Sequence, residues 1–202
     1  MRERAAAAPT IGKRITLLIG HPDPAPGRFC RALSQAYAEG ARRAGHEVRT
    51  VDVAKIDFPV LRGKDDWETG PLPENLRESQ DAIGWAEHIV LVFPLWLGTM
   101  PALVKAFLEQ VLRPGFAVGG GGSPWEKRLS GRSARIVVTM GMPAFVYRWV
   151  FGAHGLKGLE RNVLSFVGIR PVRETLIGGV EGKPEARTKW LSKMRALGEE
   201  GL

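Results

Sequence analysis

A short loop that carries one tryptophan and one glycine is the stretch of this sequence best suited to hold a flat ligand. The loop covers residues 95–100, Leu-Trp-Leu-Gly-Thr-Met, and follows the apolar run 89–93, which ends at Pro94. That run predicts a strand buried on both faces of a parallel sheet. Ligands of open α/β sheets bind at such strand ends, where this loop offers backbone N–H groups and the indole face of Trp96. A buried turn in which Trp96 only packs is an equal alternative.

A second candidate binding loop follows the first predicted strand, residues 14–20. Prolines and glycines fill residues 20–27, and an apolar helical pattern begins at Phe29. The segment Gly27-Arg28-Phe29-Cys30 therefore lies at a helix N-terminus, where unpaired N–H groups and the helix dipole attract phosphate. Arg28 could add a charge-assisted contact, and a solvated surface arginine is equally consistent with its position. Cys30 has no obvious His or Asp partner and is interpreted as a small packing residue.

The rest of the chain predicts the elements that position these loops. Apolar and alternating runs predict strands at 14–20, 47–53, 89–93, 134–140 and 172–177. Helical periodicity predicts helices at 29–41, 74–87, 103–112, 156–167 and 184–197. Residues 55–73 are interpreted as a long connection, and the glycine run 119–122 as a flexible loop. Strands that alternate with helices in this way predict an α/β sheet with right-handed crossovers.

Length and composition fit a single soluble domain. We expect a disordered leader at residues 1–13 and one domain at 14–202. The single cysteine excludes an internal disulfide framework and fits a reducing cytoplasm. No stretch approaches the roughly 20 apolar residues that span a bilayer, so no membrane insertion is expected.

The net charge of +8, from 29 basic and 21 acidic residues, suits anionic small molecules or nucleic acid. The basic residues are dispersed and form no nucleic-acid motif, so no nucleic-acid partner is expected, and a nucleic-acid-binding module is a third hypothesis that rests on charge alone. No G-x-G-x-x-G follows the first predicted strand, and no Ser or Thr follows any Gly-Lys pair, which excludes a dinucleotide fingerprint and a P-loop. No cluster of His, Cys, Asp and Glu has the spacing of a metal site.

Several motifs together resemble the NAD(P)H:quinone oxidoreductase family, flavoenzymes of flavodoxin-like fold. The similar segments are Gly-His-Pro at 20–22 with Phe29-Cys30, Phe-Pro-Leu-Trp-Leu-Gly at 93–98, Met-Pro-Ala-Leu-Val-Lys at 100–105, Arg-Pro-Gly-Phe-Ala at 113–117, and Gly-Ala-His-Gly at 152–155. The resemblance covers about residues 14–180. It implies a five-stranded parallel sheet of order 2-1-3-4-5 with helices on both faces. It also implies FMN or FAD as cofactor and NADPH or NADH as electron donor.

The resemblance also implies roles for particular residues. The flavin phosphate would lie near Arg28, Phe29 and Cys30, with His21 beside them. In family members, two loops hold the flavin ring. The corresponding residues here are Pro94, Leu95, Trp96 and Leu97 along the ring, and Thr139, Met140 and Gly141 at its polar edge. Tyr147 and His154 match the positions from which relatives stabilise charge or transfer a proton. Without the family, Tyr147 would be interpreted as packing and His154 as structural or exposed.

The family also suggests what the protein does. It implies a cytoplasmic homodimer that passes two electrons from NAD(P)H to quinones or similar acceptors. The alternative is a flavin-bearing ancillary subunit that regulates an ion-efflux system with little turnover. The sequence departs from relatives at Gly27-Arg28, where they carry a hydroxyl residue, and at Met140-Gly141, where they often have two glycines. A one-electron carrier is disfavoured because such carriers are acidic and this chain is basic.

Overall fold

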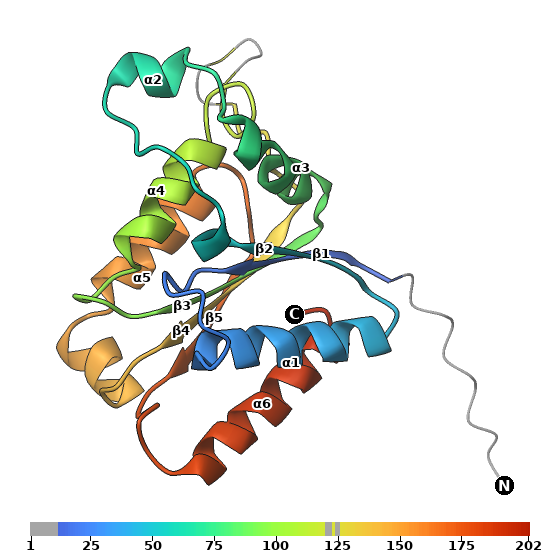
Figure 1. The fold of residues 1–202 in the computed structure, drawn as a ribbon, viewed down its shortest axis with the longest axis vertical. Coiled ribbons are helices and arrows are strands. Elements are labelled where there is room, and N and C mark those ends of the chain that lie inside the picture. The colour runs from blue at the N-terminus through green and yellow to red at the C-terminus, as the bar shows by residue number, and fades with distance from the viewer. Residues whose placement is uncertain (1–11, 120–122, 124–125) are drawn as a thin grey trace, which may run out of the picture.

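A computed structural model describes residues 12–119, 123 and 126–202 of the chain. Five parallel strands form one sheet in the order β2-β1-β3-β4-β5, which confirms the predicted fold (Figure 1). The strands are β1 Arg14–Ile19, β2 Glu47–Asp52, β3 His88–Pro94, β4 Ser133–Thr139 and β5 Val172–Ile177. Most of the predicted leader and of the glycine run lies outside the described residues.

Helices cover both faces of the sheet (Figure 1). On one face lie α1 Phe29–Arg43 and α6 Pro184–Glu199. They approach closely at two glycines, because a Cβ on Gly40 would lie 2.0 Å from the carbonyl oxygen of Arg195, and one on Gly198 would lie 2.1 Å from that of Tyr37. The other face carries α3 Arg77–Trp85, α4 Ala102–Val111, α5 His154–Gly158 and a π-helical turn, η4 Leu159–Leu164.

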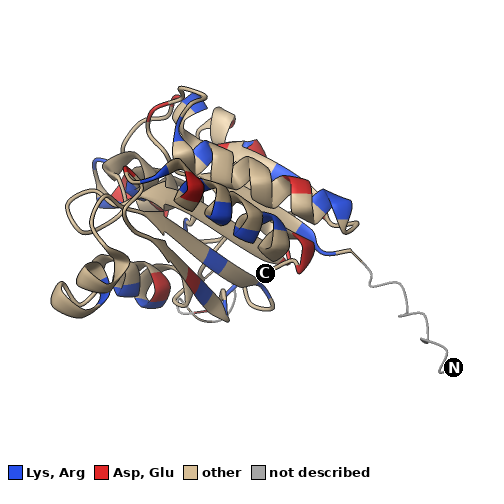
Figure 2. Cartoon of the chain, turned by 90° about the horizontal axis from the view of Figure 1, so that it is seen from below, with Lys and Arg blue, Asp and Glu red and all other residues tan. Residues whose placement is uncertain are grey.

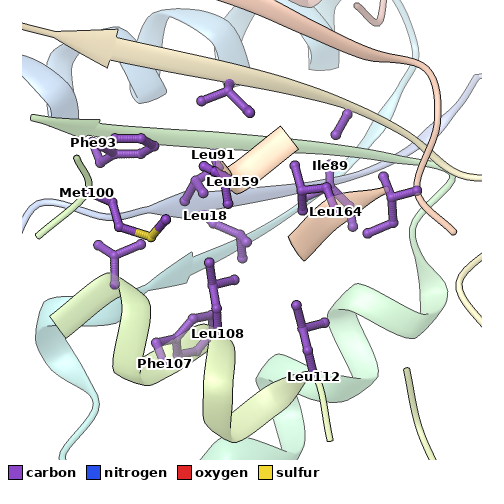
Figure 3. Packing of buried hydrophobic residues seen from close by; sticks show 14 of the residues in the cluster. Leu18, Ile89, Leu91, Phe93, Met100, Phe107, Leu108, Leu112, Leu159 and Leu164 are labelled. Atoms are coloured by element: carbon purple, nitrogen blue, oxygen red, sulfur yellow. The ribbon is translucent and has the colours of Figure 1, made fainter. Parts of the chain in front are cut away.

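Strand β3 supplies the centre of both hydrophobic layers. Its residues from His88 to Phe93 are all buried, as the unbroken apolar run predicted. Ile89, Leu91 and Phe93 face the α4 side, where Figure 3 shows them packed with side chains that include Met100, Phe107, Leu108 and Leu164. Val90 and Val92 face the opposite way, into the layer beneath α1 and α6. Side chains of a strand alternate between faces, so one apolar strand serves two cores.

Three regions differ from the sequence prediction, and two of them contain a helix or turn that the apolar pattern does not distinguish. The connection 55–73 contains a short helix, α2 Lys64–Glu68, which has no buried residue and therefore gives no hydrophobic period. The Asp66 carboxylate accepts a hydrogen bond from the Gly63 N–H at 3.1 Å and caps this helix. The predicted helix 156–167 begins earlier, at His154, and continues as the π-helical turn, a change that apolar spacing does not distinguish.

Three further short turns complete the chain. The first two are 3₁₀ helices, η1 Val53–Lys55 and η2 Glu74–Leu76, and the third is a π-helical turn, η3 Val146–Val150. The 3₁₀ turn η2 leads directly into α3, so the helix predicted at 74–87 is divided into two pieces.

His88, at the start of β3, is a buried base that makes folding depend on pH. Its Nδ1 lies 2.7 Å from the Ser133 hydroxyl, and burial, with a smaller effect from Lys13, lowers the pKa of His88 to about 3. An unfolded histidine has a pKa of about 6.5. Below that pH, His88 therefore binds a proton in the unfolded chain but not in the folded chain. The contribution of His88 to stability is present above about pH 6.5 and is lost as pH falls.

We therefore expect His88 to make the free energy of unfolding fall by about 1.4 kcal/mol per pH unit below about pH 6. Urea unfolding of the wild type and of His88→Asn at several pH values measures the effect as the difference between their slopes. His154→Gln, which replaces an exposed histidine, is the control variant. The same slope in His88→Asn and the wild type would contradict the prediction.

Candidate functional site

Three loops meet at the carboxyl ends of β1, β3 and β4. These strands are neighbours in the sheet, so the loops at residues 20–28, 95–101 and 140–153 lie at one edge. The Leu95 N–H donates to the carbonyl oxygen of Thr139 at 2.7 Å and joins the second loop to the end of β4. The cofactor-binding residues predicted from the sequence come together here. They are His21, Arg28, Phe29, Cys30, Pro94, Leu95, Trp96, Leu97, Thr139, Met140 and Gly141.

The first loop presents an uncapped helix N-terminus. Arg28 is the N-cap residue of α1, its side chain makes no cap hydrogen bond, and no acidic residue lies in the first turn. First-turn N–H groups of a helix have no partner within it, and the dipole makes this end positive. In Arg28, Nε donates to Oδ2 of Asp23 at 2.8 Å, so the guanidinium is held beside the helix end by an exposed ion pair. This arrangement favours an anion.

His21 and Asp23 shape the same loop. His21 Nδ1 accepts a hydrogen bond from the Asp23 N–H at 3.0 Å, which requires that this nitrogen carries no proton. Burial, and then the charge of Arg28, lower the pKa of His21. The Ala25 N–H and then Arg28 lower the pKa of Asp23. At neutral pH the loop therefore holds a neutral imidazole and an ionised carboxylate.

Cys30 and Thr139 join α1 to the end of β4. Both side chains are buried, and Cys30 Sγ lies 3.3 Å from Thr139 Oγ1. Burial raises the pKa of Cys30 to about 11, so its thiol stays protonated. The interpretation of Cys30 as a packing residue is confirmed by this burial. Any contact that these two residues make to a ligand must come from their backbone.

The Trp96 loop is a tight turn with strain at its tip. Trp96 and Thr99 exchange backbone hydrogen bonds of 2.9 and 3.0 Å. The two residues between them, Leu97 and Gly98, have φ angles of 47° and 80°. Glycine adopts this left-handed conformation freely, whereas for leucine it is strained, and such strain concentrates at functional sites. The Leu97 side chain is fully exposed and the Trp96 indole is 49% exposed, which suits a ligand wall.

Tyr147 holds this turn in place. Its side chain is 2% exposed, and its hydroxyl donates to the Gly98 carbonyl at 3.0 Å and accepts from the Leu156 N–H at 3.3 Å. Burial raises the pKa of Tyr147. Gly155 approaches the same carbonyl so closely that a Cβ there would lie 2.3 Å from the Gly98 oxygen. Tyr147 is therefore a positioning residue for the turn, whereas His154, at the first position of α5, has an exposed side chain.

The backbone of Met140 is also used within the fold. Its N–H donates to the carbonyl oxygen of Ile177 at 2.9 Å, and its side chain is buried. Gly141, one residue later, is exposed at the edge of the site.

Sequence reasoning missed several features of the site. The pairing of Asp23 with Arg28 could have been suspected from opposite charges five residues apart in a proline-rich loop. The close approach of Gly155 to Gly98 joins residues far apart in the chain and left no local signal. A cavity of about 700 Å³ also opens between the Trp96 loop, α4 and the turn η4, and Leu97, Met100 and Val163 are among its mostly apolar lining residues.

Two kinds of site are not found in the part of the chain that the structure describes. No group of three or more His, Cys, Asp or Glu side chains there could hold a metal ion. No helix among these residues is long and apolar enough to cross a membrane.

Comparison with known proteins identifies the fold family. A family model described as flavodoxin-like fold matches residues 13–198. A protein of Penicillium crustosum named ribosyldihydronicotinamide dehydrogenase-like protein traD is 26% identical over 178 residues. That match covers 75% of this chain and 64% of the fungal protein, so this chain spans less than two thirds of that relative.

Solved structures show the same fold. An NAD(P)H:quinone oxidoreductase from Methanothermobacter marburgensis superimposes with a TM-score of 0.75 at 23% identity, covering 94% of this chain and 96% of that chain. An FMN-dependent NADH-azoreductase from Bacillus anthracis, solved in complex with FMN, superimposes with a TM-score of 0.71 at 14% identity. The second match covers 93% of this chain and 98% of that chain.

The role of Tyr147 can be tested by removing its hydroxyl. Tyr147→Phe leaves the Gly98 carbonyl and the Leu156 N–H without their partner, and should lower the free energy of unfolding by about 1–2 kcal/mol. Urea unfolding measures this loss. Tyr37→Phe is a matched control, because the buried Tyr37 hydroxyl has no hydrogen-bond partner among the described residues. It should cost almost nothing, and equal losses in the two variants would contradict the assignment.

Proposed function

The chain belongs to the flavodoxin-like fold family, and from that membership we propose that it is a flavin-dependent NAD(P)H oxidoreductase that reduces quinones or similar acceptors. One observation carries the proposal, the uncapped N-terminus of α1 beside the exposed Trp96 turn at neighbouring strand ends. The first can bind a phosphate and the second a planar ring. The names of the fungal and archaeal relatives support the same activity.

The residues present fit a flavin phosphate. The first-turn N–H groups at Phe29 and Cys30 and the positive end of the α1 dipole would bind it. Arg28 replaces the hydroxyl residue of other family members, and its guanidinium would exchange part of its contact with Asp23 for the phosphate. His21, whose pKa is lowered by burial, lies in the same loop.

The ring would lie between the second and third loops. Pro94, Leu95, Trp96 and Leu97 would line it, as proposed from the sequence. Internal hydrogen bonds already use the N–H groups of Leu95, Trp96 and Met140. Polar contacts to the ring would therefore come from the N–H groups of Leu97, Gly98 and Gly141, near the end of Thr139.

The protein's contribution is to orient the reactants and supply a proton. When bound, FMN or FAD accepts hydride from NADPH or NADH and returns two electrons to the acceptor. Tyr147 fixes the turn against which the reactants stack, and acts through Gly98. His154 is exposed beside Gly155, which approaches the turn closely, and we propose that it holds or delivers a proton for the acceptor.

We propose that the protein is a homodimer whose second copy completes the site. Large apolar side chains are exposed at the Trp96 turn, with Leu97 fully exposed and Trp96 49% exposed, and both line the cavity beside α4. Patches of this kind mark interaction surfaces. A second copy seated over the cavity beside α4 would cover them and enclose the acceptor. The single cysteine supports a reducing compartment, and we propose the cytoplasm.

The absorbance spectrum of the purified protein tests the proposed activity. A visible flavin band should bleach on addition of NADPH or NADH and return when a quinone is added. Arg28→Gln should weaken flavin affinity roughly tenfold, because it removes a charge-assisted contact. Arg43→Gln, which alters an exposed arginine at the other end of α1, is the control and should leave flavin affinity unchanged.

The other outcomes separate the hypotheses. A bound flavin that turns over slowly with every acceptor would favour the ancillary-subunit alternative. Failure to bind either FMN or FAD after reconstitution would overturn the proposal.

The dimer is tested by the mass of the particle in solution. Light scattering should give twice the mass of one chain for the wild type. Leu97→Glu, which places a charge in the proposed interface, should shift the population towards monomer by roughly tenfold in dissociation constant or more. Val60→Glu is the matched control, because Val60 is an exposed apolar residue in the connection before α2. A monomeric wild type, or equal shifts in both variants, would contradict the proposal.

A further inference from the structure

A separate cavity of about 410 Å³ lies at the β5 edge of the sheet. It is formed by β4 and β5, by α6 and by the segment that follows β4. Its floor includes Arg135 and Thr175, and its walls include Arg148, Trp190 and Lys193. The three loops of the candidate site lie at the carboxyl ends of the strands, whereas Arg135 is the third residue of β4, nearer the amino end.

Arg135 is a buried cation whose hydrogen-bonding capacity is only partly used. The residue is 6% exposed, and its Nη1 donates to the Thr175 hydroxyl at 2.8 Å. Its Nε is buried and has no partner among the residues that the structure describes. No Asp or Glu among the residues that the structure describes forms an ion pair with Arg135. Glu200 acts on Arg135 only at a distance, without a direct ion pair, so an anion in contact with the buried guanidinium is still favoured.

Arg113 shows how the same fold satisfies a buried arginine. It is buried to a similar degree, at 7% exposed. Its guanidinium donates to three backbone carbonyls, at Gly70 (2.7 Å), Pro71 (3.1 Å) and Gln110 (3.1 Å). Carbonyl dipoles thus surround that charge, and no cavity is required. The guanidinium of Arg135 instead donates to one neutral group, the Thr175 hydroxyl, and Arg135 lines an open cavity.

The walls of the cavity add positive charge and aromatic surface. Arg148 Nη2 is 2.7 Å from the Glu174 carboxylate at the rim, so that acid is already paired. Lys193 Nζ lies 4.8 Å from the centre of the Trp190 ring. Phe145 and Trp149, both exposed, also line the cavity. The lining therefore combines cations for an anionic head group with indole surface for a planar ring.

We propose that this cavity binds a small aromatic molecule with a carboxylate or phosphate group, its oxyanion on Arg135 and Lys193 and its ring against Trp190. The occupant would also touch the segment Val146–Val150, whose Tyr147 holds the Gly98 turn of the candidate site. The proposal does not depend on the activity proposed above.

Binding can be followed by the quenching of tryptophan fluorescence and by calorimetry, with the protein as purified. The probes are benzoate and phenyl phosphate, with benzyl alcohol as the uncharged probe of similar size. Both anions should bind saturably and benzyl alcohol should not, and the tighter anion identifies the head group. Arg135→Gln should weaken binding roughly tenfold or more, since hydrogen bonds to charged groups are strong.

Variants of lysines on α6 test the binding proposal even if Arg135→Gln does not fold. Lys193→Gln, at an exposed position of α6, should weaken binding several-fold, and Lys189→Gln, one turn earlier and not among the residues that line the cavity, should not. Arg28→Gln should also have no effect, which distinguishes this cavity from the candidate site. No saturable binding of either anion up to about 10 mM would overturn the proposal. Binding that is equal in the Lys193→Gln and Lys189→Gln variants would also overturn it.

Discussion

The burial of β3 on both faces is the constraint on which the rest of this structure depends. Its side chains are packed between the α1–α6 layer and the α4 layer, and it is hydrogen-bonded to β1 and β4. A strand held on four sides has one register, because a slip by one residue would exchange its two faces. That register brings Pro94 opposite Thr139 and Ile19 opposite Val92. The three loops of the candidate site meet because those strand ends are fixed.

The sequence predicts this part of the protein well because its signals are local. All five strands are within one or two residues of their predicted bounds, since apolar runs and their proline or glycine ends lie within each segment. The position of the Trp96 turn and of the α1 N-terminus follows from the same local patterns. The short helix α2 was missed because it has no buried face, and the π-helical turn η4 because it keeps the apolar spacing of a helix.

What the sequence could not predict depends on contacts between distant residues. The Tyr147 hydroxyl is bonded on both sides, to Gly98 and to Leu156, whereas the resemblance had suggested a role in charge or proton chemistry. Cys30 is turned inward onto Thr139, 109 residues away, so that two predicted contact residues hold each other. The resemblance named these residues and did not indicate the partners of their side chains. Their donors and acceptors are assigned only when the packing is known.

The positions of individual cations, more than the total net charge of the chain, determine which anions this protein can bind. Figure 2 shows Lys and Arg interleaved with Asp and Glu along the helices on the side that it presents. Arg31 is paired with Asp52 and Arg28 with Asp23, so these two cations already have a counter-charge within the fold. A uniform basic field would favour nucleic acid, which requires an extended row of phosphate contacts. Cations that are positioned one at a time, at a helix end and in a buried cavity, instead favour small anions that carry a ring.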